Sequence, residues 1–100
     1  MSSMFRNAES FNQPLDSLDV SEVVHLAAIF WGAVNFDQPL GSWNLSSAQP
    51  PSHMFREATS YNQDLSPMCV SNIWPQPSDF DNGATSWTLP NSRPLWGQPC

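Results

Sequence analysis

Hydrophobic and polar positions along the chain follow a period of 25 residues. The segment "SFNQPLD" at residues 10–16 returns as "NFDQPLG" at residues 35–41 and as "SYNQDLS" at residues 60–66. The central aromatic residues give the step, because 36 − 11 and 61 − 36 both equal 25. One such copy cannot bury an apolar face alone, so the pattern predicts that successive copies stack into a solenoid.

The shared positions define the repeated unit and are expected to have structural roles. They are an aromatic residue, an Asn or Asp, a Gln and a Leu, with a large apolar residue three positions later. The assigned structural positions are Phe11, Asn12, Gln13, Leu15, Phe36, Gln38, Leu40, Trp43, Tyr61, Asn62, Gln63 and Leu65. Asn and Gln at a recurring turn can bond the backbone of the next coil, which satisfies polar groups that would otherwise be buried unpaired.

Apolar spacing within the unit predicts a short strand followed by a helix. Two pairs alternate as in a strand with one buried face, namely Leu18 with Val20 and Trp43 with Leu45. Three- and four-residue steps then join Val23, Leu26, Phe30 and Ala33. With Ser21 as N-cap, this spacing predicts a helix from about residue 22 to 32, and hence an α/β fold class.

Prolines interrupt the predicted helix in later copies. They are Pro50, Pro51, Pro75 and Pro77. A proline beyond the first turn costs a helix roughly 3 kcal/mol or more. The second helix should therefore shrink to about residues 52–58, and the third should be absent. Residues 1–79 are predicted to form the repeat array, with copies starting near residues 5, 30 and 55, and residues 80–100 a degenerate last repeat or irregular tail.

Composition excludes several classes of protein. Lys and Arg total 3 against 9 Asp and Glu, giving a net charge of −6, so a nucleic-acid partner is not expected. No apolar stretch is long enough for membrane insertion, and the start has no signal-peptide pattern or anchor. Because Met4 and Phe5 already match Met54 and Phe55, the chain begins inside a coil, which predicts uncapped ends that self-associate or belong to a longer array.

No residue pattern points to catalysis, a metal or a cofactor. Asp16, Asp19 and Glu22 are three residues apart, but repeat position and helix-start preference favour structural roles. His25 and His53 lack metal-ligand spacing. The sequence therefore predicts that the chain is not an enzyme.

Two tryptophans and two cysteines fall outside the repeat pattern. Trp31 and Trp74 are the candidate ligand contacts, since exposed tryptophans serve as platforms for sugars or as hot spots for proteins, although burial under an irregular loop is an equal alternative. Cys69 and Cys100 could pair, but Cys69 occupies the repeat position of Asp19 and Cys100 lies in the degenerate tail. The sequence favours leaving them unpaired.

The repeat "MFRNAESFNQPLDSLDVSEVV" resembles the unit of BspA-like leucine-rich-repeat surface proteins, over roughly residues 2–73. The matching residues are Met4, Phe5, Ala8, Phe11, Asn12, Gln13, Leu15, Asp19, Val20, Ser21 and Val23, with Leu18 in place of the tryptophan that Trp43 supplies in the next copy. The resemblance implies a leucine-rich-repeat-like right-handed solenoid of about three to four coils, located extracellularly or at the cell surface and used for adhesion or protein binding.

These observations leave three functional hypotheses. The first is a non-catalytic repeat scaffold for protein–protein or cell-surface interaction, with a partner of unknown identity. The second is a carbohydrate-binding module that uses Trp31 and Trp74. The third is a truncated or degenerate repeat fragment without independent function.

Overall fold

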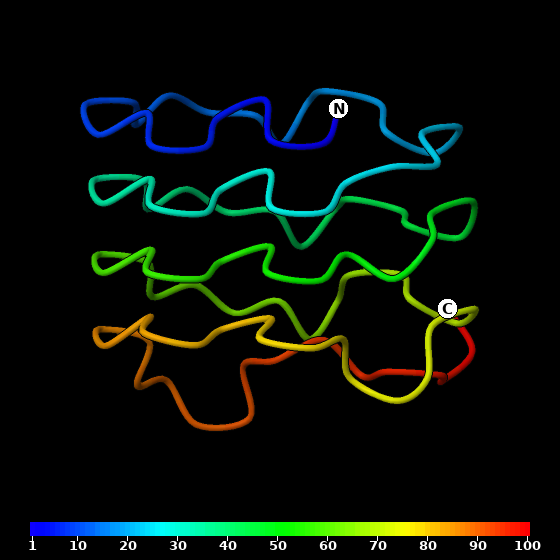
Figure 1. The fold of residues 1–100 in the computed structure, drawn as a ribbon. Coiled ribbons are helices and arrows are strands. Elements are labelled where there is room, and N and C mark those ends of the chain that lie inside the picture. Colours follow the sequence, from blue (N-terminus) through cyan, green and yellow to red (C-terminus); the bar gives the residue numbers. More distant parts are fainter.

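The computed structural model describes residues 1–100 as a stack of coils made of turns (Figure 1). One residue with a left-handed backbone marks the same point in each coil, at Ser3, Ala28, His53 and Asp79, with φ between 52° and 63°. We therefore number the coils one to four as residues 3–27, 28–52, 53–78 and 79–100. Successive coils lie one below the other, so residues 25 apart in sequence are neighbours in space.

The expected α/β, leucine-rich-repeat-like solenoid is wrong. No residue lies in a helix or a strand, and the one β-bridge is an isolated parallel pair between Asn44 and Cys69. Turns and irregular chain replace the helix predicted over residues 22–32, and turns replace most of the one predicted over residues 52–58. Extended strands are absent at residues 18–20 and 43–45 apart from that bridge. Stacking of the repeats is thus achieved without regular secondary structure.

The hydrogen bonds of residues 28–33 explain why no helix forms. The N–H groups of Ala28, Phe30 and Gly32 donate to carbonyls 24 residues ahead, those of Ser52, Met54 and Arg56, at N···O distances of 2.9, 3.0 and 2.8 Å. The N–H groups between them, of Ile29 and Trp31, donate three residues back, to the carbonyls of Leu26 and Ala28. Left-handed φ angles of 57° at Ala28 and 73° at Gly32 also break a right-handed helix. Three-residue turns reproduce the apolar spacing that predicted a helix.

The fourth coil is shifted by one residue relative to the 25-residue step. Phe30 N–H donates to the carbonyl of Met54, which is 24 residues ahead, whereas Phe55 N–H donates to Phe80, which is 25 ahead. One additional residue therefore lies in the connection between the third and fourth coils. Phe80 consequently takes the place of Met54 rather than that of Phe55.

The same shift places Trp87 where the third coil has Tyr61. The Tyr61 hydroxyl donates to the Gln38 carbonyl at 3.1 Å, and the Trp87 Nε1–H donates to the Gln63 carbonyl at 2.9 Å. Both rings thus bond the same repeat position of the coil before them. The last coil keeps the bonding of the repeat although its sequence has diverged.

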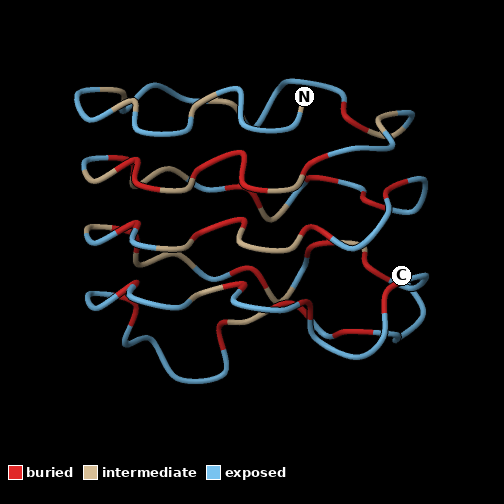
Figure 2. Cartoon of the chain, in the orientation of Figure 1, coloured by how far each residue is buried: buried red, intermediate tan, exposed pale blue.

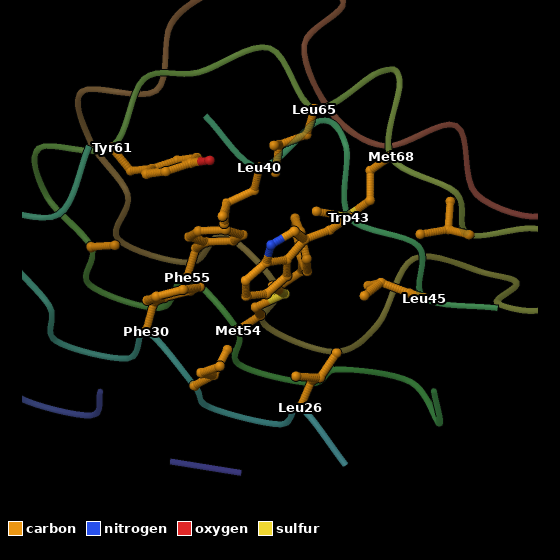
Figure 3. Close-up of a cluster of buried hydrophobic side chains, with 14 of the residues drawn as sticks. Leu26, Phe30, Leu40, Trp43, Leu45, Met54, Phe55, Tyr61, Leu65 and Met68 are labelled. Carbon is orange, nitrogen blue, oxygen red and sulfur yellow. The ribbon is translucent and has the colours of Figure 1, made fainter. Parts of the chain in front are cut away.

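Two columns of aromatic rings lie in the core of the stack, and Figure 3 shows Phe30, Phe55 and Tyr61 among the buried side chains. One column contains Phe5, Phe30 and Phe55, and the other contains Phe11, Phe36 and Tyr61. Within a column, ring centroids are 5.4–5.7 Å apart, and between columns the paired rings are 4.3–4.4 Å apart. Trp43 is buried beside them and donates its Nε1–H to the Leu15 carbonyl.

The recurring Asn and Gln residues form a ladder between coils. The Asn12 Oδ1 accepts the Asp37 N–H at 2.9 Å and the Gln38 Nε2–H at 3.1 Å. The Asp37 Oδ1 accepts the equivalent groups of Asn62 and Gln63 at 2.9 and 3.0 Å. The Asn or Asp of one coil therefore supplies an acceptor for the backbone of the next, whereas the Gln side chain bonds back to the coil before it.

The two ends of the stack differ. In the fourth coil, Phe80, Trp87 and Trp96 are at least nine-tenths buried and meet neighbouring rings edge-on or tilted, which closes the aromatic columns. In the first coil, Met4 and Leu18 are 61% and 43% exposed, and most of this coil faces solvent (Figure 2). The apolar face that later coils bury is therefore open at the first coil.

A disulfide between Cys69 and Cys100 fixes the end of the chain to the third coil, and their Cα atoms are 5.2 Å apart. The unpaired state favoured from the sequence is wrong, because the last residues turn back beneath the third coil. There Leu65 N–H donates to the Ser92 carbonyl at 2.7 Å, and Gly97 N–H donates to the Val70 carbonyl at 3.2 Å. No helix of the chain has the length and apolar character needed to cross a membrane.

Candidate interaction surface

Arg6, Trp31 and Arg56 occupy one repeat position in three successive coils and stack on each other. The guanidinium carbon of Arg6 is 4.0 Å from the centroid of the Trp31 ring, and that of Arg56 is 4.8 Å from it. Because the two arginines come from the coils before and after Trp31, the indole lies between two cations. We call these three residues the Arg–Trp–Arg column.

Backbone bonds hold this column in place. Asn7 N–H donates to the Trp31 carbonyl at 2.7 Å, and Gly32 N–H donates to the Arg56 carbonyl at 2.8 Å. Gly32 has a φ of 73°, and a Cβ added there would collide with the Asn7 side chain. Glycine at this position avoids the collision, and the coils on either side of the ring are closely packed.

His53 and Asp79 flank the column on its C-terminal side. The His53 ring is 5.0 Å from the Trp31 ring. The Asp79 Oδ2 lies 3.7 Å from His53 Nε2 and 3.5 Å from an Arg56 terminal nitrogen. The Nε of Arg56 is buried without a hydrogen-bond partner, and Arg6 forms no side-chain hydrogen bond or ion pair. Positive charge at the column is thus only partly compensated.

The third arginine is different. Arg93 Nε donates to Asp81 Oδ2 at 2.7 Å, and its guanidinium carbon lies 3.8 Å from the Trp87 ring centroid. This arginine therefore secures the fourth coil. In a chain with a net charge of −6, the Arg–Trp–Arg column is where cationic side chains gather.

The two tryptophans predicted as ligand contacts lie in different environments. Trp31 is half-buried and has arginines over its ring, whereas Trp74 is 76% exposed. Trp74 packs at its base against Gly97, where an added Cβ would come within 3.2 Å of the Trp74 Cβ. The structure shows no ring contact between Trp31 and Trp74. They do not form one site.

Asp19, one of the acidic residues singled out in the sequence, accepts a hydrogen bond from the backbone. Asp19 Oδ1 accepts the Ser21 N–H at 2.9 Å, and hydrogen bonds from Ser21 hold the pKa of Asp19 below its usual value. Asp64 accepts the Ser66 N–H in the same way, with the same direction of pKa change. No group of three or more His, Cys, Asp or Glu side chains gathers, and the surface has no pocket.

Arg6 and Arg56 lie outside the site residues predicted from the sequence. The signal was nevertheless present, because 31 − 6 and 56 − 31 both equal the repeat length of 25. Residues at one repeat position lie in a column when the repeats stack. Once the copies are aligned, surface columns can therefore be found by comparing the positions that vary between copies as well as those that are shared.

Tyr61 is the single tyrosine of the chain, and it reports on the core. Burial raises the pKa of its hydroxyl well above the ordinary value, with a smaller contribution from the nearby Asp37 carboxylate. Its hydroxyl proton is also used in the bond to the Gln38 carbonyl. Ionised Tyr61 is therefore incompatible with the folded core.

We expect stability to fall at alkaline pH because of Tyr61. The pKa of Tyr61 is higher in the folded chain than in the unfolded chain, so its contribution to the free energy of unfolding is complete below about pH 10. Above that pH the contribution falls by about 1.4 kcal/mol per pH unit. Urea unfolding at a series of pH values measures this slope, and ultraviolet absorbance follows tyrosinate directly. Tyr61→Phe should remove the slope, and a tyrosinate signal from the folded chain near pH 10 would contradict the prediction.

The stacked 25-residue coils with a closed last coil define a tandem-repeat protein. Residues 1–91 match the model of a family described as "Mycoplasma protein of unknown function, DUF285". The chain belongs to this family. Searches among curated proteins and among solved structures found no match.

Proposed function

We propose that the chain is a non-catalytic repeat scaffold that binds a protein partner through the Arg–Trp–Arg column. The column itself is the observation that supports this function, because Arg and Trp are the residue types most enriched at binding hot spots. Here one tryptophan and two arginines from three coils share one surface. Apolar positions that the copies share form the core. The position of Arg6, Trp31 and Arg56 differs between copies and presents side chains for contact.

Preorganisation of the column favours binding. Trp31 is half-buried and in contact with both guanidinium groups, and backbone bonds join its coil to those before and after it. Ordering a side chain at an interface costs about 0.5–1.5 kcal/mol, and a column that is already ordered avoids part of this cost. Shallow contacts over several coils are the way in which repeat scaffolds bind proteins.

An extracellular or cell-surface location is part of the proposal. The disulfide between Cys69 and Cys100 supports it, because disulfides persist in oxidising compartments and are rare in the cytosol. The resemblance of the repeat sequence to BspA-like surface proteins supports the same location. The proposal takes from this resemblance the surface location and the binding role, but not the α/β fold.

The test compares proteins captured from a cell-surface extract by immobilised wild-type and variant chains. Arg6→Gln with Arg56→Gln removes two positive charges from the column. Ser17→Glu with Thr85→Glu changes the net charge equally at two exposed residues outside it. We expect the captured proteins to be lost from the first variant and kept by the second. Equal capture by both variants would rule out the column as the binding surface.

Exposure of Trp74 favours a second candidate, carbohydrate binding. Its side chain is 76% exposed and can offer a ring face to a sugar, whereas the ring of Trp31 is occupied by Arg6 and Arg56. Titration with a glycan panel should then shift tryptophan fluorescence, and Trp74→Ala should abolish the shift while Trp31→Ala leaves it. A panel without any shift would count against this candidate.

A further inference from the structure

The two arginines of the column have guanidinium groups that are available to bind an anionic ligand. Arg6 is exposed and has no acidic partner. Arg56 shares Asp79 with His53 at 3.5 and 3.7 Å, distances longer than a charge-assisted hydrogen bond. By contrast, Arg93 is fully engaged with Asp81 at 2.7 Å. A ligand carboxylate would therefore gain contacts at the column that the chain itself does not make.

The spacing of the two guanidinium groups suits an extended peptide. Their distances to the Trp31 centroid are 4.0 and 4.8 Å, so the two guanidinium carbons are at most 8.8 Å apart. Side chains two residues apart on an extended chain lie on one face, about 6.6 Å from each other. Carboxylates at alternate residues can thus reach both arginines at once.

Carboxylates match the column better than sugar rings do. The guanidinium fork pairs with a carboxylate through two parallel N–H···O bonds. Sugar rings bind by stacking on a free aromatic face, and the Trp31 ring is already covered by guanidinium groups. The surface also has no pocket that would seat a sugar ring.

We propose that the Arg–Trp–Arg column binds an extended acidic peptide whose alternate carboxylates pair with Arg6 and Arg56. This rests on the proposed function and names the chemistry of its partner. The indole of Trp31 lies between the two guanidinium groups, whose carbons are at most 8.8 Å apart, within reach of alternate carboxylates. Asp79 and His53 border the C-terminal end of the site, and Asp79 disfavours a third carboxylate beyond Arg56.

The test measures binding of a fluorescently labelled peptide that alternates Glu and Thr, with a Gln–Thr peptide as the uncharged probe. Anisotropy should rise with the Glu–Thr peptide only, and the affinity should fall with added salt. Arg6→Gln should weaken binding about fivefold, as expected for about 1 kcal/mol from an exposed ion pair. Because the Arg6 side chain makes no hydrogen bond or ion pair within the chain and its backbone bond to Ser3 is kept, this variant should fold normally, which a urea titration checks.

Matched variants separate pairing from general attraction. Ser17→Glu lowers the net charge as much as Arg6→Gln does and should leave affinity within about twofold, since Ser17 is exposed and outside the column, where salt screens its charge. Arg6→Lys keeps the charge but loses the fork and should give an intermediate affinity. Equal weakening by Ser17→Glu and Arg6→Gln would overturn the proposal. So would binding of a sulfated glycan at the column without binding of the Glu–Thr peptide.

The two proposals fail in different ways. If extract proteins require the column but the Glu–Thr peptide does not bind, the scaffold function stands and the acidic-peptide inference is wrong. If the captured proteins do not depend on the column and the peptide does not bind, both are wrong.

Discussion

Reduction of the disulfide between Cys69 and Cys100 is expected to lower the free energy of unfolding by about 3–4 kcal/mol. The two cysteines are 31 residues apart, and a crosslink of that loop length restricts the unfolded chain by roughly this amount. Urea unfolding with and without a reducing agent measures the difference. Such a loss is a large fraction of the 5–15 kcal/mol typical of a folded domain.

The location of the disulfide makes this loss consequential for the whole stack. The segment that it holds places Trp96 edge-on to Phe80 at a centroid distance of 4.9 Å and bonds Trp96 Nε1–H to Gln76. Once released, this segment would expose the end of the aromatic core. We therefore expect the fourth coil to lose amide protection from hydrogen exchange before the second coil does.

Controls separate the crosslink from other effects of the reagent. A Cys69→Ser, Cys100→Ser variant should unfold at the stability of the reduced wild type and should not respond to reducing agent. A change of less than about 1 kcal/mol on reduction would show that the tail is held by packing alone, contrary to the loop-entropy expectation.

Stacking of the repeats and much of the core were predictable from sequence. When copies of fixed length stack, equivalent residues of successive copies come into contact. The ladder from Asn12 to Asp37 followed from the same logic. The absence of helices could not be predicted from the sequence, because apolar residues three and four positions apart fit both a helix and a series of three-residue turns. Hydrogen bonding to the next coil, as at Phe30 N–H, decided between them, and that partner is remote in sequence.

The end of the chain was the least predictable part. The additional residue before the fourth coil changes the step from 25 to 26, so alignment at the fixed period misplaces Phe80 and the residues after it. Pairing of Cys69 with Cys100 depends on the return of the tail beneath the third coil, for which the sequence has no local signal. The Arg–Trp–Arg column can be located from the repeat length alone. It does not stand out in the sequence because its members differ in residue type.

Phe36→Ala is expected to destabilise the chain by about 3–5 kcal/mol, the range for removal of a fully buried Phe. Phe36 is 0% exposed, and its ring contacts Phe30 at 4.3 Å and both Phe11 and Tyr61 at 5.7 Å, so its loss leaves a cavity that interrupts both aromatic columns. Phe36→Leu keeps most of the apolar volume and should lose less, because stacking contributes about 0.5–1.5 kcal/mol per ring pair beyond burial.

Phe11→Ala provides the matched control, because Phe11 has the same repeat position one coil earlier and is only half-buried. Solvent already reaches its outer face, so the truncation removes less buried surface and opens no closed cavity. Urea unfolding of both variants should therefore show the larger loss for Phe36→Ala. Equal losses would mean that the first coil is as well covered as the second, and its open apolar face would then have to be shielded in solution by another molecule of the chain.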